Sequence, residues 1–191
     1  MIALVRHGQT EWSASGRHTS TTDIPLTTVG EDQARTVPAT LATLGIRPAV
    51  VWTSPRLRAA RTATLAGLTV DAVQDDLAEW NYGAYEGRTT ADIRTQRPDW
   101  DLFRDGCPDG ESPAQISARA DRVLALATTT AVDGDLVLVC HGHMSRVLAA
   151  RWVALPVTAA ASIAMDPAAV TVLGTQHAAP IILHANVPAP H

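Results

Sequence analysis

Lysine is missing from this chain, because all 15 basic residues among its 191 are arginine. A Walker-type phosphate loop needs a lysine, and so does catalysis through a Schiff base. Both mechanisms are therefore excluded. Cysteine is scarce as well, and Cys107 and Cys140 are too few to form a disulfide framework. Cys140 ends an apolar run, which favours a small buried strand residue.

The sequence also lacks long apolar runs and an excess of positive charge. No segment approaches the roughly 18 consecutive apolar residues of a membrane span, and the N-terminus has no signal-peptide pattern. We therefore expect a cytoplasmic protein without a membrane segment. The net charge of -4 argues against broad binding to nucleic acids or anionic membranes, because such binding favours a basic surface.

The overall composition is that of an ordinary globular protein, with 46% hydrophobic and 18% charged residues. A chain of this length fits one compact domain, whereas two domains would be cramped. We expect residues 1–191 to form a single domain, with a flexible tail at residues 186–191.

Apolar strand patterns alternate with helical patterns along the chain. The pattern predicts strands at residues 2–6, 49–53, 69–73, 135–140, 170–173 and 181–183, and helices from residue 28 onward and at 55–66, 90–96, 113–130 and 144–154. Within the strand at 135–140, Leu136-Val137-Leu138-Val139 is an unbroken apolar run, as in strands buried on both faces. The alternation predicts an α/β fold, a doubly wound and mostly parallel sheet flanked by helices.

Three helix starts carry local signals. Thr28 and Glu31 have the spacing of a capping box, and Pro38 should kink or interrupt the helix that follows. Ser54-Pro55 and Ser112-Pro113 each place a capping residue before a proline that suits the first helical position.

Polar residues follow three of the predicted parallel strands. Arg6-His7-Gly8 follows the first strand, Ser54-Pro55 follows the second, and His141-Gly142-His143 follows the long one. In an open α/β sheet, ligands bind outside the carboxyl ends of the strands, which lie at one edge. An imidazole there can act as a nucleophile, arginine can hold phosphate oxygens, and glycine allows close backbone approach. The arrangement favours phosphate chemistry.

Leu4-Val5-Arg6-His7-Gly8-Gln9-Thr10-Glu11-Trp12 resembles the signature of the histidine phosphatase superfamily, the phosphoglycerate-mutase-like proteins. Order and spacing agree from residue 1 to about residue 155, and the sequence is most similar to the small bacterial acid phosphatases of that superfamily. Further matches are Pro25-Leu26-Thr27, Thr53-Ser54-Pro55, Arg58-Ala59, Thr62-Ala63, Glu79, Gly83, Glu86-Gly87, Gly110-Glu111-Ser112 and His141-Gly142.

The resemblance implies a catalytic set. His7 would attack phosphorus and carry a phosphohistidine, Arg6 and Arg58 would hold the phosphoryl oxygens, and His141 would donate to them. Glu79 would protonate the leaving alkoxide and then activate water, with no metal or other cofactor required. The residues expected to bind phosphate or substrate are Arg6, Gly8, Gln9, Thr10, Ser13, Thr19, Ser20, Arg58, Glu79, Tyr82, His141 and Gly142.

Two of these positions depart from the family pattern. Ser13 stands where many members have asparagine, and a serine hydroxyl reaches less far. Thr19-Ser20 occupies the loop where mutases typically show Thr-Gly. Arg56 and Arg61 also replace common leucine and glutamine, and we hypothesise that one of them widens the positive field for a substrate with a second anionic group.

The run Glu79-Trp80-Asn81-Tyr82-Gly83 favours a phosphatase over a mutase. The mutases resemble Glu-Arg-His-Tyr-Gly there and use further basic residues to hold the carboxylate of phosphoglycerate. They are also longer, and their extra segments shield the phosphoenzyme from water. We therefore expect hydrolysis of a small phosphorylated metabolite, by a chain that can form a homodimer.

Several alternatives stay open at this stage. One is a phosphoglycerate or sugar-phosphate mutase, and another is a non-catalytic domain that binds a phosphorylated ligand. Glu86 is the nearest substitute for Glu79 as the acid. His141 and His143 could instead form a metal site, but an alternating pair without a cysteine or carboxylate partner is poor zinc spacing. We expect an orienting or structural role for His143.

Overall fold

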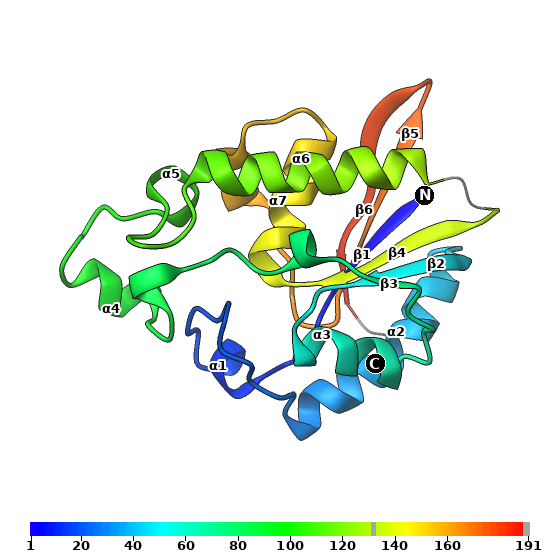
Figure 1. The fold of residues 1–191 in the computed structure, drawn as a ribbon. Coiled ribbons are helices and arrows are strands. Elements are labelled where there is room, and N and C mark those ends of the chain that lie inside the picture. The colour runs from blue at the N-terminus through cyan, green and yellow to red at the C-terminus, as the bar shows by residue number, and fades with distance from the viewer. Residues whose placement is uncertain (131–132, 189–191) are drawn as a thin grey trace.

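The computed structural model, which describes residues 1–130 and 133–188, contains a six-stranded sheet with helices on both faces (Figure 1). Its strands are β1 (Ile2–Arg6), β2 (Pro48–Thr53), β3 (Ala72–Val73), β4 (Asp135–Cys140), β5 (Val170–Gln176) and β6 (Ala179–Val187). Their order is β3-β2-β4-β1-β5-β6. Strands β1 to β4 pair in parallel, whereas β5 and β6 pair antiparallel. The predicted fold class, an α/β protein with a mostly parallel sheet flanked by helices, is confirmed.

The helices complete two layers around this sheet. They are α1 (Glu11–Ala14), α2 (Thr28–Thr43), α3 (Leu57–Leu65), α4 (Thr90–Arg94), α5 (Leu102–Asp105), α6 (Pro113–Thr129) and α7 (Gly142–Trp152), with 3-10 turns η1 (Asp75–Leu77), η2 (Gly83–Tyr85) and η3 (Val157–Ser162). Helices α6 and α7 pack on the face that holds Leu4 and Leu138, and α2 and α3 pack on the face that holds Val5 and Val139. Alternate residues of each central strand therefore enter different cores, as the period of a strand dictates.

Of the three predicted capping signals, the one at Ser112 forms as expected. Its hydroxyl accepts the N–H of Gln115 and the Gln115 side chain accepts the N–H of Ser112, directly before α6. Helix α2 is instead capped by Thr27, whose hydroxyl accepts the N–H of Gly30 at 3.0 Å, so the capping box predicted at Thr28 was wrong. The predicted interruption at Pro38 is also wrong, because α2 continues to Thr43.

The helix predicted after Ser54-Pro55 begins two residues late. Helix α3 starts at Leu57, and Arg56 occupies the capping position without a side-chain cap. The Ser54 hydroxyl lies 2.7 Å from Nε2 of His141, so it serves a buried imidazole rather than the helix start.

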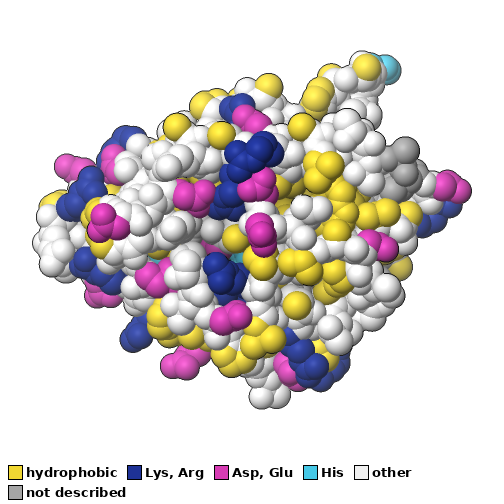
Figure 2. Space-filling view, in the orientation of Figure 1, with side chains coloured by type: hydrophobic (Ala, Val, Ile, Leu, Met, Phe, Trp, Pro, Cys, Tyr) yellow, Lys and Arg dark blue, Asp and Glu magenta, His cyan; other side chains and the backbone are white. Residues whose placement is uncertain are grey.

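At the end of the chain, β6 is longer than predicted. It pairs with β5 as far as Val187, so residues 186 and 187 lie in a strand rather than in the expected tail. Residues 189–191 lie outside the described residues. The face in Figure 2 carries arginine and acidic side chains close together. This face therefore offers mixed charge rather than a broad basic surface.

The chain that leaves β1 packs against the first turn of α2 through two glycines. A Cβ on Gly30 would lie 2.0 Å from the Gln9 carbonyl oxygen, and one on Gly8 would lie 2.2 Å from the Gly30 carbonyl oxygen. Neither position has room for a side chain, so this contact fixes the backbone that follows His7.

We expect Gly30→Ala to destabilise the protein. Helix propensity alone would favour alanine by about 1 kcal/mol, but the collision with backbone should cost about 1–3 kcal/mol. Urea unfolding measures the difference. Val29→Ala is the control, because Val29 is exposed in the same turn and should change stability by less than about 0.5 kcal/mol. Unchanged or increased stability of Gly30→Ala would show that the contact is not tight.

Candidate active site

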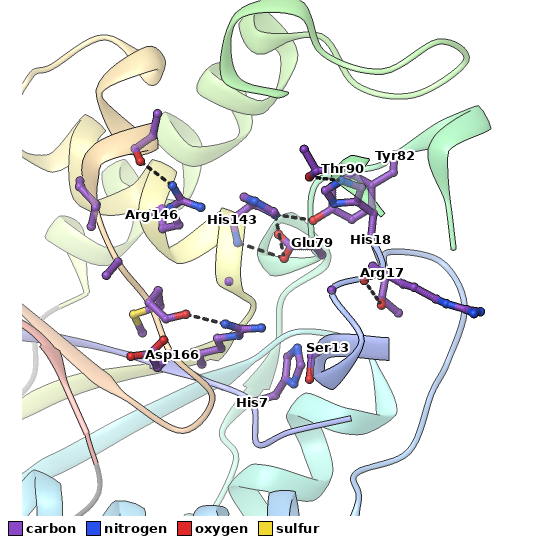
Figure 3. Close-up of a pocket in the computed structure, with 18 of the residues that line it drawn as sticks. His7, Ser13, Arg17, His18, Glu79, Tyr82, Thr90, His143, Arg146 and Asp166 are labelled. Carbon is purple, nitrogen blue, oxygen red and sulfur yellow. Dashed lines mark hydrogen bonds and ion pairs between the residues drawn. The ribbon is translucent and has the colours of Figure 1, made fainter. Parts of the chain in front are cut away.

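A cavity of about 540 Å³ opens at the carboxyl ends of β1 and β4 (Figure 3). It holds seven of the residues predicted from the sequence, namely Arg6, His7, Ser13, Thr19, Glu79, Tyr82 and Gly142. Arg58 and His141 are fully buried, and the imidazole of His141 lies 5.2 Å from that of His7 between ring centroids. The sheet edge therefore brings together the catalytic set that the sequence indicated.

His7 presents one specific nitrogen for chemistry. Its Nδ1 lies 2.7 Å from the carbonyl oxygen of Gly8. A carbonyl can only accept, so Nδ1 carries the proton and Nε2 keeps its lone pair. Burial and the guanidinium groups of Arg6 and Arg58 hold the pKa of His7 well below its ordinary value. Both effects favour the neutral imidazole, whose Nε2 lone pair can act as a nucleophile.

His141 is oriented by Ser54. Its Nε2 lies 2.7 Å from the Ser54 hydroxyl, which also accepts the Arg56 N–H at 3.3 Å. The hydroxyl proton is then directed at Nε2, which leaves the ring proton on Nδ1. That Nδ1 is buried and has no hydrogen-bond partner among the described residues. Burial, followed by the charge of Arg58, keeps the pKa of His141 well below its ordinary value.

The two candidate phosphate-binding arginines are held by backbone carbonyls. Nη1 and Nη2 of Arg58 donate to three carbonyl oxygens of loop 19–22 at 3.1–3.2 Å. Nη1 of Arg6 donates to the Met165 carbonyl at 2.6 Å. In each case Nε is buried without a partner in the described part of the chain. Such unpaired buried donors are rare and suit an anionic ligand.

Glu79 is fastened to the start of α7. Its Oε1 accepts the N–H groups of Trp80 at 3.0 Å and Met144 at 2.8 Å, and its Oε2 accepts the N–H of His143 at 3.0 Å. The first N–H groups of a helix have no partner within the helix and carry positive partial charge. The carboxyl is thus fixed beside the cavity by the same helix that follows His141.

Besides the buried Arg58 and His141, four predicted binding residues do not line the cavity. Thr10 caps α1 through its hydroxyl, and the side chain of Gln9 accepts from Thr27 at 3.0 Å. Gly8 faces Gly30, as described above. These three residues serve the packing of the loop after β1. The sequence motif therefore contains structural residues as well as residues that line the cavity.

Ser20 is the fourth of these residues, and it is bound to Glu86. Its hydroxyl donates to Glu86 Oε2 at 2.6 Å and its N–H donates to both carboxylate oxygens. Burial alone would raise the pKa of Glu86, but hydrogen bonds from Ser20 and Thr22 lower it. Glu86 does not line the cavity, so its position does not support it as a substitute acid.

The hypothesis that Arg56 or Arg61 widens the positive field for a second anionic group stays a prediction, and the charge of Arg56 does act on His141. Arg61 pairs with Glu31 at 2.8 Å on the surface, and neither arginine lines the cavity. The additional arginines that do are Arg17 and Arg146. Arg146 follows His143 by three residues on α7, and this spacing on one helix face could have indicated it.

The far wall of the cavity is built from imidazole and phenol groups. Tyr82 Oη lies 2.6 Å from Nδ1 of His143, and the ring of His18 packs 4.7 Å from that of Tyr82. The Tyr82 hydroxyl thereby holds the His143 ring in place, and the expected orienting or structural role of His143 stays a prediction. Nothing in the sequence analysis had pointed to His18 or Asp166, which also line the cavity (Figure 3).

Among residues 1–130 and 133–188, no group of three or more histidine, cysteine, aspartate or glutamate side chains is arranged to hold a metal ion. In the same part of the chain no helix combines the length and apolar character required to cross a membrane.

The chain belongs to the histidine phosphatase superfamily (branch 1), whose sequence profile matches residues 2–188. An acid phosphatase of Mycobacterium tuberculosis is 46% identical over 92% of this chain and 87% of its own length. The sedoheptulose 1,7-bisphosphatase of Saccharomyces cerevisiae is 40% identical over 81% of this chain and 68% of its own length. The structure of a functionally characterised Mycobacterium tuberculosis open reading frame matches with a TM-score of 0.95 at 42% identity, over 99% and 98% of the two chains.

We expect the buried His18 to make the protein sensitive to acid. Burial lowers the pKa of His18 from 6.5 to about 4, so between these values the unfolded chain binds a proton that the folded chain does not. Stability then falls as pH drops from about 6.5 to 4, by up to about 3 kcal/mol from this residue. Urea unfolding across that range should show a shallower decline for His18→Gln. His177→Gln, at an exposed position, is the control, and equal slopes for His18→Gln and wild type would contradict the prediction.

Proposed function

We propose that this protein is a phosphomonoesterase that hydrolyses small phosphate monoesters through a phosphohistidine on His7. The observation that carries the proposal is the state of this imidazole: buried, neutral, with Nδ1 committed to Gly8 and Nε2 left with its lone pair. Arg6 and Arg58, whose charges both act on His7, suit a phosphoryl group held in front of that nitrogen.

In the first step, Nε2 of His7 attacks phosphorus and the bond between phosphorus and the ester oxygen breaks. Glu79 gives its proton to the departing alkoxide, which leaves as the alcohol. Charge that develops on the phosphoryl oxygens is stabilised by the unpaired Nε groups of Arg6 and Arg58 and by Nδ1 of His141. These donors supply what the step needs, so the proposed chemistry requires neither a metal nor an organic cofactor.

In the second step, Glu79 is a carboxylate and takes a proton from water. The water oxygen attacks phosphorus, the bond to Nε2 breaks, and inorganic phosphate leaves. Glu79 is protonated again and His7 is neutral, so the cycle closes.

Hydrolysis is favoured over transfer between two hydroxyls. Relatives and neighbours of this chain include an acid phosphatase, a sugar bisphosphatase and a glucosyl-3-phosphoglycerate phosphatase, the last with a TM-score of 0.82 at 28% identity. The residue two after Glu79 is Asn81, which uses its side-chain oxygen to accept the Gly83 N–H. It supplies no positive charge for a phosphoglycerate carboxylate. The cytoplasmic location and the homodimer stay predictions.

A labelled phosphoester tests the intermediate directly. Rapid acid-free quenching of the wild-type protein should trap a phosphoryl adduct that is acid-labile and maps to His7. His7→Gln should form none and lose at least about 1,000-fold in kcat, because the nucleophile is gone. His177→Gln, at an exposed site, should label normally. Turnover without label at His7 would overturn the proposal, and conversion of 3-phosphoglycerate to its isomer without phosphate release would replace a hydrolase by a mutase.

Glu79→Gln should separate the two roles of the acid. We expect kcat for alkyl phosphates to fall about 10²–10⁴-fold, since their alkoxides need a proton. Formation of the adduct from p-nitrophenyl phosphate should suffer less, because nitrophenolate leaves without protonation, and the adduct should accumulate when no base activates water. Burst kinetics with both ester types measures this, and equal losses in adduct formation for the two types would contradict the role of acid.

A further inference from the structure

Asp166 lines the cavity but takes no part in the proposed chemistry. It lies on the connection between η3 and β5, a segment that forms much of one cavity wall together with its neighbours from Ala161 onward. Figure 3 shows this segment across the cavity from Tyr82 and His18. A carboxylate on the wall of a site that binds a phosphate ester is unfavourable unless it recognises something else in the substrate.

Asp166 is held in place by Asn186 of β6. The Asn186 side-chain amide donates to Oδ2 of Asp166 at 2.9 Å, and the Asp166 N–H donates to Oδ1 of Asn186 at 2.6 Å. Asn186 has a φ of 50°, a left-handed conformation that asparagine tolerates better than most residues. Its own N–H donates to the buried Thr171 hydroxyl at 3.0 Å. Oδ1 of Asp166 makes no hydrogen bond to the described residues, so it can accept one from a ligand.

The charge of Asp166 reaches the phosphate-binding end of the cavity. Burial lowers the pKa of Arg6, while Glu79, Tyr82 and Asp166 act in the opposite direction. Arg6 also donates to the carbonyl of Met165, the residue before Asp166. A phosphoryl group held by Arg6 would therefore place the adjoining part of its alcohol near the Asp166 carboxylate.

Neither Arg146 nor Arg17, the additional arginines of the cavity, forms an ion pair with the Asp166 carboxylate. Arg146 donates from Nε and Nη2 to the carbonyls of Ala160 and Ala161, both at 2.9 Å, and its guanidinium stacks 4.6 Å from the Phe103 ring centroid. Figure 3 shows Arg17 extending away from His7. Two of the five N–H groups of Arg146 are thus used by the protein, and Arg17 lies at the rim.

We propose that Asp166 determines specificity: it accepts a hydrogen bond from a hydroxyl of the leaving alcohol and disfavours a carboxylate there. The inference rests on the proposed phosphatase activity and names its substrate class, the phosphate monoesters of sugars and other polyhydroxy alcohols. Phosphorylated carboxylic acids are disfavoured because a second negative charge would meet the Asp166 carboxylate. Asn186 is the positioning residue for this contact.

Two esters that differ only at one carbon test the inference. Glycerol 3-phosphate carries a hydroxymethyl group where 3-phosphoglycerate carries a carboxylate. Wild-type protein should prefer the former in kcat/KM, and Asp166→Asn should reduce the ratio about tenfold or more, since a hydrogen bond to a charged acceptor and a like-charge repulsion are both lost. Hydrolysis of p-nitrophenyl phosphate, which has neither group, should stay within about twofold. Asn186→Gly, which permits the same backbone conformation, should reduce the ratio less.

Asp32→Asn is the matched control, because it removes the same charge from an exposed position that is paired only with Arg35. It should leave the ratio unchanged. A ratio unchanged in Asp166→Asn, with p-nitrophenyl phosphate still hydrolysed, would overturn the inference and leave the phosphatase proposal intact. If the wild type released phosphate from none of the three esters, the phosphatase proposal would fail. Calorimetry would then measure the affinities of glycerol 3-phosphate and 3-phosphoglycerate for wild type and Asp166→Asn. The ratio of these two affinities would decide the inference in place of the kcat/KM ratio.

Discussion

The pairing register of β1 with β4 is the constraint on which the site depends. Arg6 lies opposite Cys140, and the N–H of His7 donates to the Cys140 carbonyl at 3.0 Å. The two strands consequently end level, and the next residue of each is a histidine. Both strands are buried on two faces, and a shift of one residue would turn every side chain to the other core. Packing in the sheet interior therefore sets the distance between the two imidazoles.

In this chain without lysine, buried arginines hold the loops around the site by donating to their carbonyl oxygens. Arg119 donates to the carbonyls of Asp76, Ala78 and Glu79 and pairs with Glu111 at 2.7 Å. Arg58, as described above, gathers loop 19–22 in the same way. A planar guanidinium can satisfy several acceptors at fixed angles, which a single ammonium cannot. The cost of burying these charges is offset by the carbonyl and carboxylate acceptors around them, and the segments that carry Glu79 and Thr19 are fixed as a result.

Much of this site could be predicted from the sequence because its residues follow strands whose apolar pattern is unambiguous. Parallel pairing of the two strands is enough to bring His7 and His141 to the same edge of the sheet. The start of α3 could not be predicted, since Ser54 has two possible partners and the choice depends on His141, 87 residues away. Asp166 had no local signal either. Its position is set by Asn186, in a strand whose pairing and length the short apolar run at 181–183 did not reveal.

Because Glu79 is bound to the first turn of α7, the proposed cycle couples the protonation of Glu79 to the stability of this turn. An anionic carboxyl stabilises a helix start by roughly 0.3–1 kcal/mol at an exposed site, and by more when it is partly buried. A neutral carboxyl stabilises the helix start less. Each turnover would therefore tighten this turn when the proton is given up and relax it when the proton returns. The turn begins at His141 and carries Gly142 against the guanidinium of Arg6, where a Cβ would lie 3.2 Å from its central carbon. In the proposed mechanism, proton transfer at Glu79 would therefore affect the positions of His141 and Arg6.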